Sequence, residues 1–168
     1  EYVEELTEKQ VVSGDGTGYF RPYDFVTREQ FVKMILLATG TELSTSPNTF
    51  EDVVSGAWYE QYIVTAKENG IVNGITDSTF GVGANVSRQD MATIIARILA
   101  NKGYTFDATT EKFADDTSIA DYAYDAVYTL KGLGLVNGSD GKYNPKSNLT
   151  RAEAAKVMSS LIKFIEEK

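Results

Sequence analysis

The stretch Val26-Thr27-Arg28-Glu29-Gln30 decides the fold, because similar stretches occur at two further places in the chain. They are residues 86–90, Val-Ser-Arg-Gln-Asp, and residues 149–153, Leu-Thr-Arg-Ala-Glu. Each opens a run in which apolar residues recur with the 3.6-residue period of an α-helix. The first and third stretches also fit a capping box, in which the threonine and a Glu or Gln three residues later satisfy amides at the helix start. We therefore expect a helix to begin at each stretch, with the weakest cap at Ser87 and Asp90.

Shorter motifs repeat with the same period of about 60 residues. Val72-Asn73-Gly74 has counterparts at residues 12–14 and 136–138, and each is followed by an aromatic residue. Phe50-Glu51-Asp52 corresponds to residues 113–115. Fixed periods of this kind indicate tandem structural repeats. We expect three repeats, residues 1–44, 45–107 and 108–168, of which the first lacks its N-terminal part.

Each repeat is expected to hold a second helix before the one that opens at the arginine stretch. In repeats 2 and 3 it begins near Trp58 or Ala120 and ends at Gly70 or Gly134, because glycine commonly follows the last helical residue. Residues 1–10 form the corresponding helix of repeat 1. Any β pairing is expected to be brief, at residues 11–12 or 81–82. The fold class is therefore mainly α, built from three similar helical hairpins.

Composition narrows the function classes. The chain has 168 residues, no cysteine, no histidine and a net charge of −8. Thiolate and imidazole metal sites are excluded, and the commonest general base is missing. No repeat is basic and no apolar run approaches the ~20 residues of a membrane span, so neither nucleic acid nor membrane insertion is expected. Threefold repetition suits binding at similar clefts better than one active site, so we expect neither an enzyme nor a cofactor.

Arg28, Arg88 and Arg151 occupy the first turn of the three expected helices, where the helix dipole repels a cation by ~0.3–1 kcal/mol. Helix stability alone favours an acidic residue there. One interpretation is that guanidinium and free helix amides together hold an anion, since the arginine fork suits carboxylate or phosphate. The other is an internal salt bridge to Asp52 or Asp115. The residues alone leave both open.

The remaining candidates also have two interpretations each. Gly74 and Gly138 either supply positive φ in a turn or let a ligand approach the backbone. Trp58, the only tryptophan, either stacks on a sugar or lies buried at a helix start. Asp15-Gly16 lacks the oxygen spacing of a calcium loop, so no metal is expected.

These motifs together resemble S-layer homology domains. The resemblance rests on Thr-Arg-Ala-Glu at 150–153, the Phe-x-Asp segments, Gly-Ile-Val-Asn-Gly at 70–74 and Phe-Arg-Pro at 20–22. It covers almost the whole chain as three tandem units, and it implies a pseudo-threefold trimer of repeats within one chain. Repeat 2 departs most from the pattern, with Gly81-Val82 in place of Arg21-Pro22.

The resemblance also implies a function: non-covalent anchoring of a surface protein to secondary cell wall polysaccharide, outside the cell. The implied ligand is a pyruvylated amino sugar, whose carboxylate the motif arginine grips in grooves between repeats. One or two of the grooves are expected to bind, unequally. The alternative is an assembly module that packs against neighbouring surface-layer subunits. The residues that the resemblance assigns to the ligand are Arg28, Arg88 and Arg151, with Asp52, Asp115, Trp58, Gly14, Gly74 and Gly138 as the groove wall.

Overall fold

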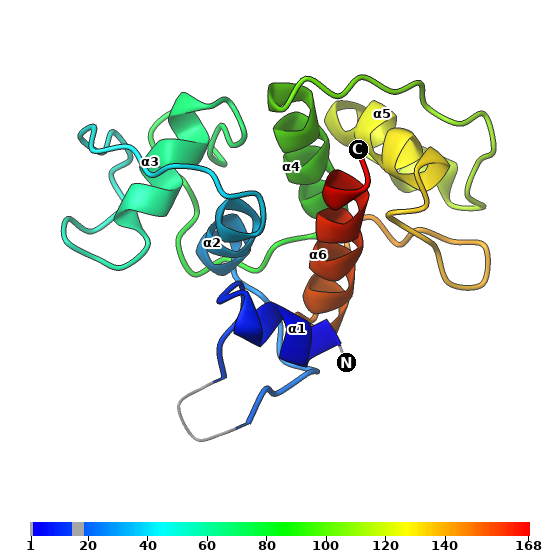
Figure 1. Ribbon diagram of the computed structural model, residues 1–168. Helices are drawn as coiled ribbons and strands as arrows, with labels where there is room; N and C mark the ends of the chain where they lie inside the picture. Colours follow the sequence, from blue (N-terminus) through cyan, green and yellow to red (C-terminus); the bar gives the residue numbers. More distant parts are fainter. Residues whose placement is uncertain (1, 15–18) are drawn as a thin grey trace. The chain divides into compact units, whose positions relative to one another are not determined.

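The computed structural model describes residues 2–14 and 19–168. Asp15 and Gly16, which were compared with a calcium loop in the sequence, lie outside the described residues. The described residues form helices and connecting loops, with isolated β-bridges in place of strands (Figure 1). The helices are α1 (Tyr2–Glu8), α2 (Arg28–Ala38), α3 (Glu60–Glu68), α4 (Arg88–Asn101), the short 3-10 helix η1 (Asp116–Ser118), α5 (Asp121–Gly132) and α6 (Arg151–Glu166). The mainly α fold class is confirmed.

The three helix starts are those that the sequence predicts. Thr27 and Thr150 are N-caps with complete capping boxes, formed with Gln30 and Glu153. Ser87 caps α4 by accepting from the amide of Asp90, but no reciprocal bond from Asp90 completes a box. The shorter aspartate explains this difference, as expected.

Helix ends are set by residues with positive φ. Gly40, Gly70, Gly103 and Gly134 follow α2, α3, α4 and α5 with φ between 61° and 85°. After each, an amide bonds back to a carbonyl in the last turn, as from Ile71 to Ala66. Helix α1 ends in the same way, but Gln10 takes the glycine's place at φ 58°.

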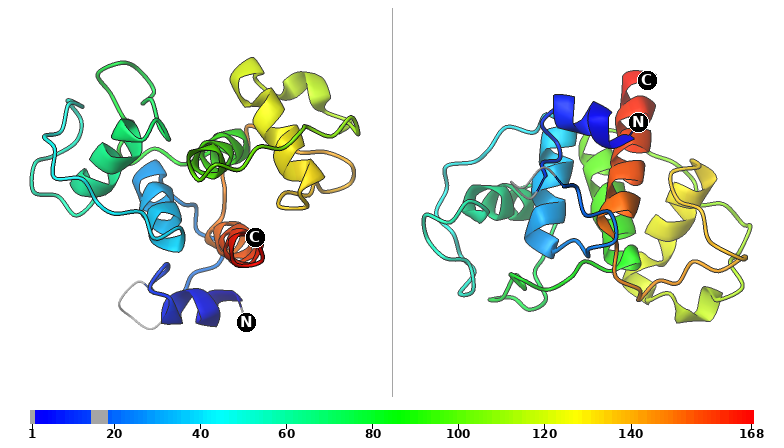
Figure 2. Two further views of the ribbon diagram at one scale, coloured as in Figure 1. Left: turned by 45° about the horizontal axis from the view of Figure 1, so that its top comes forward. Right: turned by 90° about the horizontal axis from the view of Figure 1, so that it is seen from below.

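The chain forms two compact units. The first consists of residues 1–85 and 150–168 and the second of residues 86–149. In the first unit α1 and α2 pack against α6, and α3 packs against α2. Figure 2 shows α1 lying crosswise to α6. Fully buried Leu6, Phe31, Ile35, Ile63 and Leu161 belong to the core of this unit.

The second unit is built on α4 and α5, which pack together (Figure 1). Phe113 stacks on Tyr128 and Tyr143, with ring centroids 5.9 and 5.3 Å apart. Both tyrosines are fully buried. This aromatic cluster fixes the loop after α5, which carries the residues that contact Arg88. The predicted pseudo-threefold arrangement and the repeat boundaries stay predictions.

Among the described residues three isolated bridges form at the helix starts, and none forms at residues 11–12 or 81–82, where the sequence suggested brief pairing. Phe25 pairs with Thr150, Thr27 with Asn85, and Ser87 with Asn148. Each of these three bridges joins the residues before an arginine helix to a segment far away in the sequence, whereas a fourth joins Ser139 to Lys142 within one loop. The brief β pairing therefore holds the helix starts in place.

Candidate functional site

Each arginine helix begins against a loop of another predicted repeat. The first helical amides, those of Arg28, Arg88 and Arg151, donate to the carbonyls of Ala84, Ser147 and Asp24 at 2.9, 3.0 and 2.8 Å. The next amide is also bound in two cases, since Gln89 donates to Pro145 and Ala152 to Pro22. Loop carbonyls therefore already accept from the first amide of every arginine helix and from the second amide of two, so these amides are not free to donate to an anion.

The guanidinium groups contact the same loops. Nε of Arg28 donates to the carbonyl of Phe80, that of Arg88 to Tyr143 and that of Arg151 to Phe20, at 3.1, 2.8 and 2.8 Å. Each guanidinium carbon also lies 4.7–5.2 Å from the centre of that aromatic ring. Charge-assisted bonds and cation–π contact together stabilise the loop. The motif arginine therefore has a structural role, whatever it binds.

These contacts link the predicted repeats in cyclic order. Arg28 of repeat 1 contacts the loop of repeat 2, and Arg88 of repeat 2 contacts the loop of repeat 3. Arg151 of repeat 3 contacts the loop of repeat 1, 131 residues away in the sequence. Each contact lies within one of the two compact units.

Asp52 and Asp115 bind the amides of these loops. Asp52 accepts from Phe80, Gly81 and Val82 at 2.7–2.8 Å, and Asp115 accepts from Tyr143 and Asn144 at 2.8 Å. Burial of Asp52 acts to raise the pKa of its carboxyl, but the three amides outweigh it and the pKa lies below the usual 3.8. Each aspartate thus holds the turn whose carbonyl accepts from Arg28 or Arg88.

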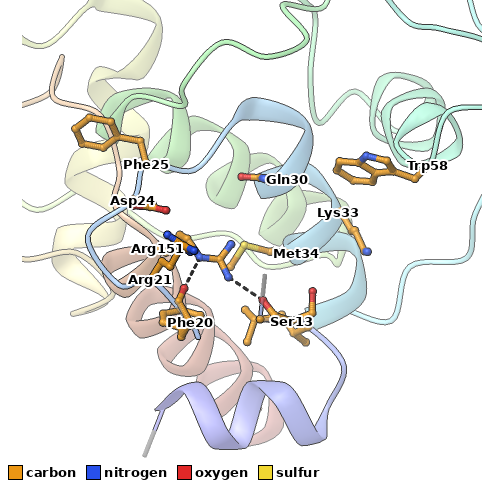
Figure 3. A pocket seen from close by; sticks show the side chains of 13 residues that line it. Ser13, Phe20, Arg21, Asp24, Phe25, Gln30, Lys33, Met34, Trp58 and Arg151 are labelled. Carbon is orange, nitrogen blue, oxygen red and sulfur yellow. Dashed lines mark hydrogen bonds between the residues drawn. The ribbon is translucent and has the colours of Figure 1, made fainter. Parts of the chain in front are cut away.

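The three arginines differ in their surroundings. Arg28 is buried, with 8% of its surface exposed, and a Cβ built on Gly81 would lie 3.3 Å from its side chain. Arg88 is half-buried and its Nη2 reaches the carbonyl of Asn137 at 3.4 Å. Arg151 is half-buried, donates from Nη2 to Ser13 O at 2.7 Å, and lines a pocket (Figure 3). Similar motifs therefore give unequal surroundings for the three arginines.

The pocket at Arg151 has a volume of about 450 Å³ and lies wholly within the first unit. Its floor and walls include Val11, Val12, Ser13, Gly14, Phe20, Arg21, Asp24, Phe25, Gln30, Lys33, Met34, Trp58 and Arg151. In Figure 3, Asp24 and Phe25 lie toward one side, Lys33 and Trp58 toward the other, and Arg151 between them. Three of the residues predicted to bind ligand, Arg151, Trp58 and Gly14, are thus brought together.

Three cations and one carboxylate line this pocket, although the whole chain has a net charge of −8. Arg21, Lys33 and Arg151 supply the positive charge, and Asp24 is the acid. Such a local excess attracts an anion because distant surface charges are screened beyond about 10 Å at ordinary salt. No sequence pattern singled out Lys33, and Arg21 was noted only as part of the Phe-Arg-Pro motif at residues 20–22.

Trp58 is 52% exposed, so the interpretation that it is a buried residue at a helix start is wrong. Its ring meets Tyr59 edge to face at 5.3 Å, and Nζ of Lys33 lies 5.3 Å from its centre. Phe25, on the other side of the pocket, is 51% exposed. The pocket therefore presents apolar ring faces beside cations, a combination that suits an acidic sugar.

Gly74 and Gly138 lie in tight turns and are not among the residues that line this pocket. A Cβ on Gly74 would lie within 2.7 Å of Thr76 O, Thr79 O and Phe50, and its φ is +84°. A Cβ on Gly138 would lie 2.3 Å from Lys142 O, although Gly138 is not among the residues with positive φ. Close packing within the chain thus requires both glycines, and positive φ is needed only at Gly74.

Comparison with known proteins identifies the family. The model of the S-layer homology domain matches residues 1–32, 49–92 and 112–155, more than half of the chain in three segments. The chain belongs to the S-layer homology domain family. The suspected resemblance and the three repeats are confirmed, and with them the expected extracellular location at the cell surface.

Three relatives illustrate the range of proteins that contain such a segment. An endoglucanase of Bacillus sp. (strain KSM-635) is 36% identical over 165 residues, which are 96% of this chain and 17% of that protein. The surface-layer 125 kDa protein of Lysinibacillus sphaericus is 28% identical over 99% of this chain and 14% of its own length. A cellulosome-anchoring protein of Acetivibrio thermocellus is 24% identical over 84% of this chain and 33% of its own.

The chain spans a third or less of each of these relatives. The activity that the name endoglucanase states belongs to that much longer protein. Within residues 2–14 and 19–168, no helix has the length and apolar character needed to cross a membrane.

Proposed function

We propose that this chain anchors its parent protein to the cell wall without a covalent bond, by binding an acidic glycan in the pocket at Arg151. The ligand we propose is a pyruvylated amino sugar of secondary cell wall polysaccharide. The observation that carries the proposal is the pocket itself, in which a motif arginine meets two further cations and two exposed aromatic rings. Membership of a surface-anchoring family supports it.

The geometry of Arg151 supports a carboxylate as the bound group. Nε and Nη2 donate to Phe20 O and Ser13 O, which fixes the plane of the guanidinium. Among the described residues Nη1 has no hydrogen-bond partner, and the side chain lines the pocket. An immobilised donor of this kind binds a carboxylate with little loss of side-chain entropy.

The pocket at Arg151 is proposed as the dominant site. Repeat 1 supplies Arg21, Phe25 and Lys33, whereas repeat 2 has Gly81, Asn85 and Thr93 at the equivalent positions. The burial of Arg28 further lowers its access to ligand. Among the candidate groove residues Asp52, Asp115, Gly74 and Gly138, the contacts described above are all with the chain itself, so we propose that they support the loops and do not touch the sugar.

The assembly alternative requires a contiguous apolar surface away from the arginines. Two of the exposed large apolar residues, Phe25 and Trp58, instead line the pocket at Arg151. This location favours ligand binding over packing against neighbouring subunits.

Calorimetric titration with a pyruvylated amino sugar tests the proposal, with the same sugar lacking pyruvate as the control ligand. We expect only the pyruvylated form to bind, and Arg151→Ala to weaken that binding by about tenfold to a hundredfold, the value of a charge-assisted hydrogen bond. Arg88→Ala is the matched control and should leave the affinity within about twofold. Equal binding of both sugars, or full affinity in Arg151→Ala, would contradict the proposal.

A further inference from the structure

The backbone at Arg21 is in the left-handed region, with φ 52°. Side chains with a Cβ rarely adopt this conformation, and a long residue does so only when the surrounding structure enforces it. Pro22 follows directly and restricts Arg21 further, since a residue before proline favours extended backbone. Arg21 therefore occupies a strained position.

The equivalent positions in the other repeats share the conformation but not the residue. Repeat 2 has Gly81 at φ 94° and repeat 3 has Asn144 at φ 56°. Glycine adopts positive φ without strain, and asparagine tolerates it better than most residues. The turn thus demands a left-handed residue in all three repeats, and repeat 1 alone meets the demand with an arginine.

The side chain of Arg21 lines the pocket that also contains Arg151 (Figure 3). Strain at a ligand pocket is retained when the side chain contributes something that a relaxed residue cannot. Here the contribution is a second guanidinium in the pocket. It belongs to the residue directly after Phe20, whose carbonyl accepts from the motif arginine Arg151.

We infer that Arg21 is a second ligand-binding arginine, which contacts the acidic group of the glycan together with Arg151 and makes this pocket bind more tightly than its counterparts. The inference rests on the proposed function. It assigns the specificity of the pocket to a residue outside the Thr-Arg motif, because the motif arginine is present in all three repeats. The inference also means that one residue, Arg21, both contacts the ligand and has the strained backbone conformation.

Two substitutions separate binding from strain. Arg21→Ala removes the guanidinium and keeps a Cβ at positive φ, whereas Arg21→Gly removes both. We expect each variant to bind the pyruvylated amino sugar at least about tenfold more weakly than the unsubstituted chain in calorimetric titration. We expect Arg21→Gly to unfold at a higher temperature than Arg21→Ala, by roughly 2 °C. Asn144→Gly, the equivalent change in repeat 3, should leave the affinity unchanged.

The outcomes distinguish this inference from the proposed function. Suppose that the chain binds the sugar, that Arg151→Ala weakens binding by about tenfold or more, and that both Arg21 variants bind within about twofold of the unsubstituted chain. The role of Arg21 is then overturned and the proposed function stands. If the unsubstituted chain does not bind the sugar, the proposed function fails and this inference fails with it. An Arg21→Gly variant that is less stable than Arg21→Ala would show that the turn is not strained, which also overturns the inference.

Discussion

Arg88 and Tyr143 are joined by two reciprocal hydrogen bonds, although 55 residues separate them. Nε of Arg88 donates to the carbonyl of Tyr143 at 2.8 Å, and the hydroxyl of Tyr143 donates to the carbonyl of Arg88 at 2.7 Å. Burial raises the pKa of the Tyr143 phenol, which keeps the hydroxyl protonated and donating. The equivalent aromatic residues, Phe20 and Phe80, have no hydroxyl and make only the first type of bond.

Tyr143→Phe should therefore destabilise the chain without preventing folding. The phenyl ring keeps its stacking on Phe113, and only the hydroxyl bond is lost, which corresponds to about 0.5–1.5 kcal/mol in the free energy of unfolding. Urea unfolding measures the change. Tyr23→Phe is the control, because Tyr23 is 87% exposed, and it should have no measurable effect. Equal stability of the two variants would contradict the role of the hydroxyl.

Gln10→Gly should stabilise the chain. Gln10 follows α1 at φ 58°, in the place that Gly70 and Gly134 occupy after α3 and α5. Glycine relieves the left-handed strain, and we expect the melting temperature to rise by roughly 2–4 °C for about 1 kcal/mol gained. Gln10→Ala keeps a Cβ at positive φ and should produce no gain. A lower melting temperature for Gln10→Gly than for Gln10→Ala would refute this account of the helix end.

Gly138→Ala should destabilise strongly because of a steric clash. The new Cβ would lie 2.3 Å from Lys142 O and 2.8 Å from the ring of Phe113, so the turn must shift. We expect a loss of at least about 2 kcal/mol, comparable with overpacking a core. Gly141→Ala is the matched control, because its Cβ enters open space and only the positive φ of 75° is unfavourable. Chemical unfolding measures the loss of stability in both variants, and we expect the larger loss in Gly138→Ala. A larger loss in Gly141→Ala would contradict the steric clash at Gly138.

The carboxylate of Asp52 should make stability dependent on pH in the acid range. Its pKa is lower in the folded chain than the usual 3.8, so the unfolded chain binds its proton first as the pH falls. The stabilisation is fully present above pH 5 and is lost as the pH falls through the folded pKa, below about 4. Urea midpoints between pH 7 and pH 3 should fall less steeply in Asp52→Asn. Asp107→Asn, at an exposed aspartate, removes the same charge and should retain the original slope.

Trp58→Ala should weaken ligand binding more than it affects stability. Half of the side chain is exposed, so we expect the free energy of unfolding to change by less than about 1.5 kcal/mol. Loss of the ring face in the pocket should reduce affinity for the pyruvylated amino sugar about tenfold. Tyr122, its approximate counterpart in repeat 3, is 57% exposed, and Tyr122→Ala should bind normally. If Trp58→Ala and Tyr122→Ala bind the sugar with equal affinity, Trp58 does not contact the ligand.

Local sequence determined the helices. Thr27 and Thr150 begin them because a side-chain oxygen three residues from an amide can cap it without help from the rest of the fold. The glycines that end them act just as locally, through φ. Repetition of these signals then identified the family, since three copies at one spacing are far more specific than one.

Only the tertiary structure decided which motif arginine lines a pocket. Arg28 and Arg151 both follow a threonine at a helix start, yet the side chain of Arg28 packs against Gly81, whereas Arg151 lines a pocket. The difference comes from loops 52 and 131 residues away, whose contacts no local pattern encodes. Loop carbonyls also accept from the first amide of each arginine helix, an amide that the sequence suggested was free for an anion. Helix starts follow from neighbours along the chain, whereas access to a side chain depends on whatever the fold packs around it.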